Sequence, residues 1–139
     1  MKKVFILVAI IFLNSILFAE TIVDEAQLPQ MAKDFISRVF SGVKISFVEK
    51  DRSSFEVLLS NGMKIDFNKK GEWQNIDSES MPIPFNVLPD NIISIIKSKY
   101  PDVMLIDVEK SGKNYKVKLS NTVEMVIRAD GKIIKHELD

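Results

Sequence analysis

One stretch of the chain occurs twice: Val48-Glu49-Lys50, Phe55, Val57, Leu59-Ser60-Asn61 and Gly71 return as Val108-Glu109-Lys110, Tyr115, Val117, Leu119-Ser120-Asn121 and Gly131. Each member of the second set lies 60 residues after its counterpart, with no insertion between them. Self-similarity at a fixed period is the sequence signature of a repeated structural unit. The sequence therefore predicts two copies of one unit within 139 residues.

Each copy opens with the same helix signal. Leu28-Pro29 and Leu88-Pro89 begin the copies, and proline suits the first turn of a helix because its missing N–H would have no partner there. Apolar residues then recur at helical spacing, which predicts one buried stripe on each helix. The stripes are Met31, Phe35, Ile36, Val39 and Phe40 in the first copy and Ile92, Ile93, Ile95, Ile96 and Tyr100 in the second.

Four short strands are predicted after each helix. They cover residues 43–50, 55–60, 63–67 and 72–77 in the first copy, and 103–109, 115–120, 123–128 and 132–137 in the second. Alternation of apolar and polar residues, as in residues 63–67, is typical of strands with one buried face. Asn61-Gly62 predicts a two-residue hairpin turn of type I′.

The expected fold class is α+β. Two tandem α-β4 repeats would form one antiparallel sheet of about eight strands, with both helices on one face. One repeat alone would have a small core and an open sheet edge, so we expect a single half to be unstable.

The expected organisation is a signal peptide at residues 1–19, a leader at 20–27, a repeat at 28–77, a Pro-containing linker at 78–87 and a second repeat at 88–139. The leader is expected to be irregular. In the linker, Met81, Ile83 and Phe85 predict a strap laid over apolar surface, because a solvated linker would not need them.

The first residues have the pattern of a secretory signal. Lys2-Lys3 precede an apolar run from Val4 to Leu13, and Ala19 is a small residue at a plausible cleavage position. Leu17 is larger than usual for its place before the cut, so the site could shift. An uncleaved anchor is the alternative, although the run is short for a span of roughly 20 residues. Cleavage would leave a bacterial periplasmic or secreted chain with no membrane contact.

Composition excludes several classes of function. The 19 basic and 19 acidic residues balance, which argues against a nucleic-acid partner because such proteins carry a basic stripe. Without cysteine, the chain has no disulfide, thiol nucleophile or thiolate metal site. The sequence leaves the oligomeric state open.

No catalytic, metal or cofactor site is expected, and the chain is predicted not to be an enzyme. His136 is the one histidine and lacks a second ligand cluster, so it predicts an edge-strand position rather than a metal site. Asp77 and Glu79 suit a solvated turn better than a calcium loop, which needs several oxygens around one point. Trp73 is expected to pack in the core or at the junction of the copies, with a ligand platform as the alternative.

The candidate binding residues are those that alternation places on the sheet face away from the helices. This face mixes charges with isolated apolar groups, as both a solvated sheet face and a protein-binding surface do. The candidates are Lys44, Ser46, Glu56, Leu58, Lys64, Asp66, Met104, Lys116, Lys118, Glu124, Val126 and Arg128.

The chain resembles the PepSY-like family, which is described as β-lactamase-inhibitor-protein-like. The resemblance lies in Leu-Pro opening a helix, Val-Glu-Lys, an alternating strand, Ser-Asn and glycine, and covers nearly all of residues 28–139. It also covers the junction from Gly71-Glu72-Trp73 through Pro82-Ile83-Pro84 to Leu88-Pro89. The resemblance implies a secreted or periplasmic domain of tandem α-β4 units with a curved open face, in a family where several relatives are suspected binding or inhibitory modules. It brings no catalytic motif.

Two functions remain open from the sequence. The first is a periplasmic module that recognises a protein or peptide through the open sheet face, with inhibition as one form of such binding. The second is a small-molecule or envelope-sensing protein that holds a ligand between the strap (residues 81–85) and the sheet.

Overall fold

The computed structural model describes residues 21–79 and 81–138, and the predicted signal peptide lies outside them. The helices are α2 (Gln30–Val39) and α3 (Asp90–Lys99), and each is preceded by a short 3₁₀ turn, η1 (Glu25–Gln27) or η2 (Phe85–Val87). The strands are β1 (Thr21–Val23), β2 (Ile45–Lys50), β3 (Ser54–Leu59), β4 (Lys64–Asn68), β5 (Trp73–Asp77), β6 (Leu105–Ser111), β7 (Asn114–Leu119), β8 (Val123–Arg128) and β9 (Ile133–Leu138). In this part of the chain, neither helix has the length and apolar character needed to span a membrane.

The nine strands of the described residues form one open antiparallel sheet in the order of the chain, from β1 to β9. The protein is therefore of the α+β class, as expected, but the sheet has one strand more than predicted. The extra strand is β1, in the leader that was predicted to be irregular. Its Val23 lies opposite Val48 of β2, so a short apolar segment gains the hydrogen bonds of the sheet edge.

The two repeats meet where β5 pairs with β6. Ile76 lies opposite Val108 in this pair, and both side chains are fully buried. The core continues without a break across the junction, since buried residues of both repeats belong to one cluster.

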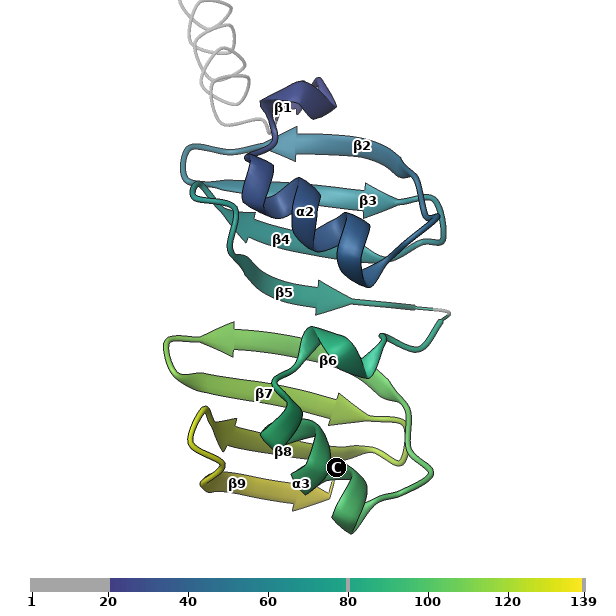
Figure 1. The fold of residues 1–139 in the computed structure, drawn as a ribbon, viewed down its shortest axis with the longest axis vertical. Coiled ribbons are helices and arrows are strands. Elements are labelled where there is room, and N and C mark those ends of the chain that lie inside the picture. Colours follow the sequence, from purple (N-terminus) through teal and green to yellow (C-terminus); the bar gives the residue numbers. More distant parts are fainter. Residues whose placement is uncertain (1–20, 80, 139) are drawn as a thin grey trace, which may run out of the picture.

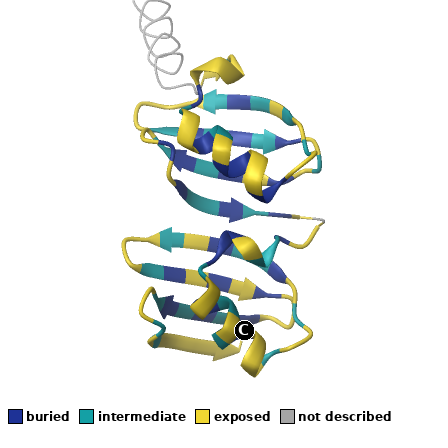
Figure 2. Ribbon diagram, in the orientation of Figure 1, coloured by how far each residue is buried: buried dark blue, intermediate teal, exposed yellow. Residues whose placement is uncertain are grey.

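Along each helix and most strands, buried positions alternate with exposed ones. The buried positions form one core layer between the helices and the sheet. In Figure 1, α2 and α3 both lie in front of the sheet, and no helix is drawn in front of β5. Figure 2 shows the outer sides of both helices exposed while alternate strand positions are buried. The buried helix residues include Phe35 and Ile36 from α2 and Ile92 and Ile96 from α3.

The repeat extends to the irregularities of the sheet. The pairing of β2 with β3 shifts at Ser46, and that of β6 with β7 shifts at Ile106. A second pair of shifts occurs at Gln74 and Ile134. Each bulge thus recurs at the 60-residue period of the sequence, which shows that the copies share backbone detail as well as residue pattern.

The predicted type I′ turn at Asn61-Gly62 is wrong. Gly62 has a φ of +87°, but Asn61 is not at positive φ, as that turn would require. The amide of Gly62 instead donates to the carbonyl of Leu59 at 3.0 Å, which makes a three-residue loop closed by a left-handed glycine. The side chain of Asn61 accepts from the amide of Met63 at 3.1 Å, so its polar group supports the turn directly.

The linker lies against the sheet. The amide of Ile83 donates to the carbonyl of Leu105 at 2.8 Å, and the Ile83 side chain is 2% exposed. Phe85 packs against the core and has the Lys97 ammonium 4.9 Å from its ring centroid, whereas Met81 is exposed. Ile83, the middle residue of the strap, therefore fills the space beside β6 with its own side chain.

Candidate protein-binding face

The strand register places a continuous row of side chains on the side of the sheet away from the helices. Their chain neighbours, such as Val57, Ile65 and Val108, are buried in the core, and successive side chains of a strand point to opposite faces. We call this the first row: Ile22, Glu49, Glu56, Asp66, Asn75, Glu109, Lys116, Val126 and Lys135.

A second row runs parallel to the first on the same face. It holds the directly opposed apolar pair Phe47 and Leu58 at β2 and β3, neither of which belongs to the core cluster. Together the two rows form the open face. The second row is Phe47, Leu58, Lys64, Asp77, Asp107, Lys118, Glu124 and Glu137.

Carboxylates outnumber lysines in these two rows. Diagonal ion pairs offset part of this charge, with Lys64 Nζ 3.6 Å from Glu56 Oε1 and Lys116 Nζ 3.3 Å from Glu124 Oε1. Both pairs are partly exposed, and exposed pairs contribute little to stability. The open face is thus an acidic surface with local lysines and an apolar patch at Phe47 and Leu58.

Two carboxylates face each other at the junction of the repeats. Asp77 and Asp107 are directly opposed across β5 and β6. Partial burial raises the pKa of the Asp107 carboxyl above its ordinary value, and the nearby charges of Asp77 and Glu109 raise this pKa further. Lys116 and Lys118 act in the opposite direction. The junction therefore holds a carboxylate whose ionised form is disfavoured in the folded chain.

Replacing Asp107 by asparagine is expected to stabilise the protein by about 0.5 kcal/mol at pH 7, because like charges directly opposite each other in a sheet are destabilising. A pKa raised in the folded state means that the folded chain binds the proton more tightly than the unfolded chain. Wild-type stability is therefore lost as the pH rises from the ordinary carboxyl pKa of about 4 through the raised value. Urea unfolding across this range should show the gain of Asp107→Asn growing with pH.

The matched control is Asp102→Asn, which removes a carboxylate from an exposed loop position. It should give no comparable gain. A difference between Asp107→Asn and wild type that stays constant with pH would contradict the role assigned to this carboxyl.

Most of the predicted site residues lie in the two rows. Glu56, Asp66, Lys116 and Val126 are in the first row, and Leu58, Lys64, Lys118 and Glu124 are in the second.

The other four predicted residues lie at the margin of the open face. Lys44 and Met104 directly precede β2 and β6, and their amides donate to the hydroxyls of Ser60 and Ser120. Arg128 ends β8 and pairs with Asp130, which lowers the pKa of that carboxyl to about 2. Strict alternation is wrong at Ser46, because the bulge makes Ser46 the extra residue and places Phe47 opposite Leu58.

Sequence reasoning missed several members of the open face. Phe47 and Asp107 follow bulges, which reverse the phase of alternation within a strand. Asn75 and Asp77 belong to β5, which was predicted as a strand but not assigned a face. Glu49 and Glu109 could have been found, since each directly follows a valine of the repeated Val-Glu-Lys stretch.

His136 lies on the other side of the sheet, toward the helices. His136 lies opposite Met125 on edge strand β9, and its Nε2 is 2.6 Å from the Tyr100 hydroxyl at the end of α3. The predicted edge-strand position of His136 is therefore what the structure shows. Within residues 21–79 and 81–138, no group of three or more His, Asp or Glu side chains is arranged to hold a metal ion.

These features define a class of protein: a small α+β domain in which a repeated unit builds an uncovered antiparallel sheet. The chain belongs to the PepSY-like family, whose model carries the description "Putative beta-lactamase-inhibitor-like, PepSY-like" and matches residues 18–65 and 53–135. The resemblance inferred from the sequence is thereby confirmed. Among curated proteins, none matches the chain.

Solved structures with the same fold come from Bacteroides. A "putative calcium-regulated periplasmic protein" of Bacteroides thetaiotaomicron is 30% identical, with a TM-score of 0.79 over 85% of this chain and 96% of its own. A "putative periplasmic protein" of Bacteroides vulgatus is also 30% identical, with a TM-score of 0.78 over the same shares. Another Bacteroides vulgatus protein, a "putative periplasmic protein of unknown function", is 28% identical, with a TM-score of 0.76 over 86% of this chain and 99% of its own.

Proposed function

We propose that this protein is an exported, non-catalytic binding module that recognises a protein or peptide partner through the open face. Its functional unit is the tandem pair of α-β4 repeats, with both helices on one face of the shared sheet and the other face free for a partner. Inhibition of the partner is one form that this binding could take. The similarity to periplasmic Bacteroides proteins and the predicted signal peptide support a periplasmic location.

The observation that carries this proposal is the composition of the uncovered face. Protein interfaces place apolar and aromatic anchors inside a rim of polar and charged groups. The open face has this arrangement, because Phe47 and Leu58 form an apolar pair beside Lys64 and the charged first row. The excess of carboxylates favours a partner that presents basic side chains, since complementary charge steers association and selects partners.

The alternative site between the strap and the sheet has less support. Ile83 is hydrogen-bonded directly to Leu105 and is almost fully buried. A ligand in this position would have to displace the side chain and break the hydrogen bond.

The test compares partners captured from a periplasmic extract by wild type and by the double variant Leu58→Asp, Val126→Asp. The matched control is Ser37→Asp, Ser98→Asp, which adds the same two charges at exposed positions of the helices. A captured protein would then be purified and its affinity measured by titration calorimetry. We expect the open-face variant to weaken binding at least tenfold, because apolar anchors dominate interface energy, and the control to bind like wild type. Equal binding by all three proteins would rule out this face.

A further inference from the structure

A cleft opens on the helix side of the sheet, where the first repeat meets the second. It has a volume of about 560 Å³, and α2, the turn before β5, β5 itself and β6 all contribute to its lining. This volume lies within the roughly 300–1,000 Å³ range of small-molecule sites. We call it the inter-repeat cleft, and the residues that matter are Met31, Asp34, Phe35, Arg38, Glu72, Trp73 and Lys110.

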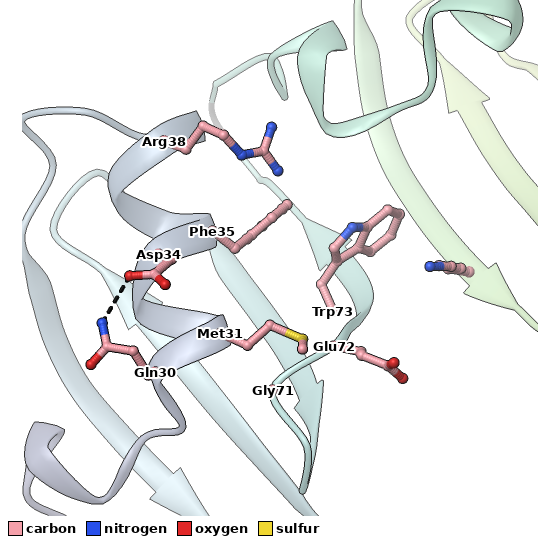
Figure 3. Close-up of a pocket in the computed structure, with 9 residues that line it drawn as sticks. Gln30, Met31, Asp34, Phe35, Arg38, Gly71, Glu72 and Trp73 are labelled. Carbon is pink, nitrogen blue, oxygen red and sulfur yellow. Dashed lines mark hydrogen bonds between the residues drawn. The ribbon is translucent and has the colours of Figure 1, made fainter.

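The apolar part of the cleft is aromatic. Phe35 and Trp73 are stacked, with ring centroids 6.1 Å apart and an interplanar angle of 26°. The ring centroid of Trp73 is also 6.2 Å from that of Tyr115 in the second repeat. Figure 3 shows the Phe35 side chain directed toward Trp73, with Met31 beside them. Both rings are mostly buried and Met31 is 54% exposed, so a flexible thioether lies over the edge of a rigid aromatic base.

Two cations lie around this base. Arg38 Cζ is 5.6 Å from the Phe35 ring centroid, and Lys110 Nζ is 5.9 Å from those of both Trp73 and Tyr115. The ring faces attract these cations but supply no counter-charge. Within the described residues, no carboxylate forms an ion pair with Arg38 or Lys110.

The two acidic residues of the cleft keep their charges, but each is hydrogen-bonded to an amide, and within the described residues neither forms an ion pair with Arg38 or Lys110. Asp34 Oδ1 accepts from the Gln30 side chain at 2.8 Å, and Glu72 Oε2 accepts from the Asn68 side chain at 2.8 Å. The cleft therefore offers two cations without a carboxylate partner beside an aromatic surface. This arrangement complements a ligand that is both planar and anionic.

Comparison of the repeats shows that the fold alone does not require this combination of aromatic and basic residues. At the 60-residue offset, Phe35 corresponds to Ile95, Trp73 to Ile133 and Arg38 to Ser98. Lys110 corresponds to Lys50, whose Nζ lies 5.7 Å from the Phe55 ring centroid. The lysine above an aromatic ring thus belongs to both repeats, whereas Phe35, Trp73 and Arg38 occur together only at the junction.

We infer that the inter-repeat cleft binds a small aromatic carboxylate. The aromatic body of the ligand lies against Met31, Phe35 and Trp73, and its carboxylate is bound by both Arg38 and Lys110. A guanidinium is suited to this role because it can donate two parallel hydrogen bonds to a carboxylate. This site is on the side of the sheet opposite the open face, so its failure and that of the proposed function are independent.

The test uses 2-naphthoate as the probe, and its neutral amide 2-naphthamide as the matched ligand control. Trp73 is the one tryptophan of the chain, so the single indole N–H signal in an NMR spectrum reports from the cleft itself. We expect 2-naphthoate to shift this signal saturably and 2-naphthamide to bind at least tenfold more weakly. No shift at millimolar 2-naphthoate, or equal binding of acid and amide, would overturn the inference.

Variants then assign the contacts. Arg38→Gln and Lys110→Gln should each weaken 2-naphthoate binding about tenfold, as expected for loss of a charge-assisted hydrogen bond. Lys50→Gln is the matched control, because it removes the equivalent lysine of the first repeat while leaving the cleft intact. Equal effects of Lys50→Gln and Lys110→Gln would show that net charge, and not the cleft, determines affinity, and would overturn the assignment.

Discussion

Replacing Gly71 by alanine is expected to lower the free energy of unfolding by about 3 kcal/mol. Gly71 has a φ of +94°, in the left-handed region that costs L-residues about 1–2 kcal/mol. A Cβ atom at this position would lie 2.9 Å from Pro29 Cβ and 3.0 Å from the Ala32 amide nitrogen at the start of α2. Because Ala32 N is backbone, the helix itself would have to move, and overpacking of this kind costs about 1–3 kcal/mol.

Gly131→Ala is the matched control for this prediction. Gly131 has the same φ of +94° in the second repeat, but the nearest atom to an added Cβ is the end of the Ile95 side chain, at 3.2 Å. A side chain can adjust more easily than a helix backbone. We therefore expect Gly131→Ala to lower the free energy of unfolding by about 1–2 kcal/mol, from the backbone conformation alone. Urea unfolding of both variants would measure the difference, and equal losses would contradict the close approach of α2 to Gly71.

The fragment of residues 20–77 is expected not to fold on its own. In the full chain, β5 is covered on its far edge by β6, and Ile76 is buried beside Val108. The fragment would expose this edge and leave Trp73 without Tyr115. A domain of some 60 residues buries only about 60% of its unfolded surface and is already marginal, so the loss of these contacts should remove the folded state.

Thermal unfolding followed by circular dichroism would test this expectation, with the chain from residue 20 to 138 as the reference. The reference should unfold in one cooperative transition, and the fragment should show none. A cooperative transition of the fragment alone would mean that the first repeat is an independent domain.

The 60-residue period carried most of the information about the fold. It located the helices that follow Leu28-Pro29 and Leu88-Pro89, and eight of the strands, because repeated apolar spacing reflects repeated burial. It could not reveal β1, since Thr21–Val23 is too short and mixed to show a period. That segment becomes a strand only because the edge of β2 is available to it.

Single-residue features of the face were less predictable. The bulge at Ser46 arises from how β2 pairs with β3, and no residue type in the sequence marks it. It changes which of Ser46 and Phe47 faces Leu58, and so changes the apolar content of the open face. The two cations of the inter-repeat cleft could not be predicted from the sequence either, because Arg38 and Lys110 come together only through the pairing of β5 with β6.

The order of the strands has a consequence for how fast the protein reaches its native state. Every strand pairs with its neighbour in the chain, so most ladders form by closing short hairpin loops, and folding rates rise as contacts become more local in sequence. Two pairings are exceptions: β1 pairs with β2 across η1 and α2, and β5 pairs with β6 across the linker and α3. The pairing of β5 with β6 spans the longer of these two connections, and it must wait until the linker and α3 have been brought back to the sheet. This closure has the largest entropic cost of the sheet, so substitutions at Ile76 and Val108 should slow folding, whereas substitutions in β8 and β9 should mainly accelerate unfolding.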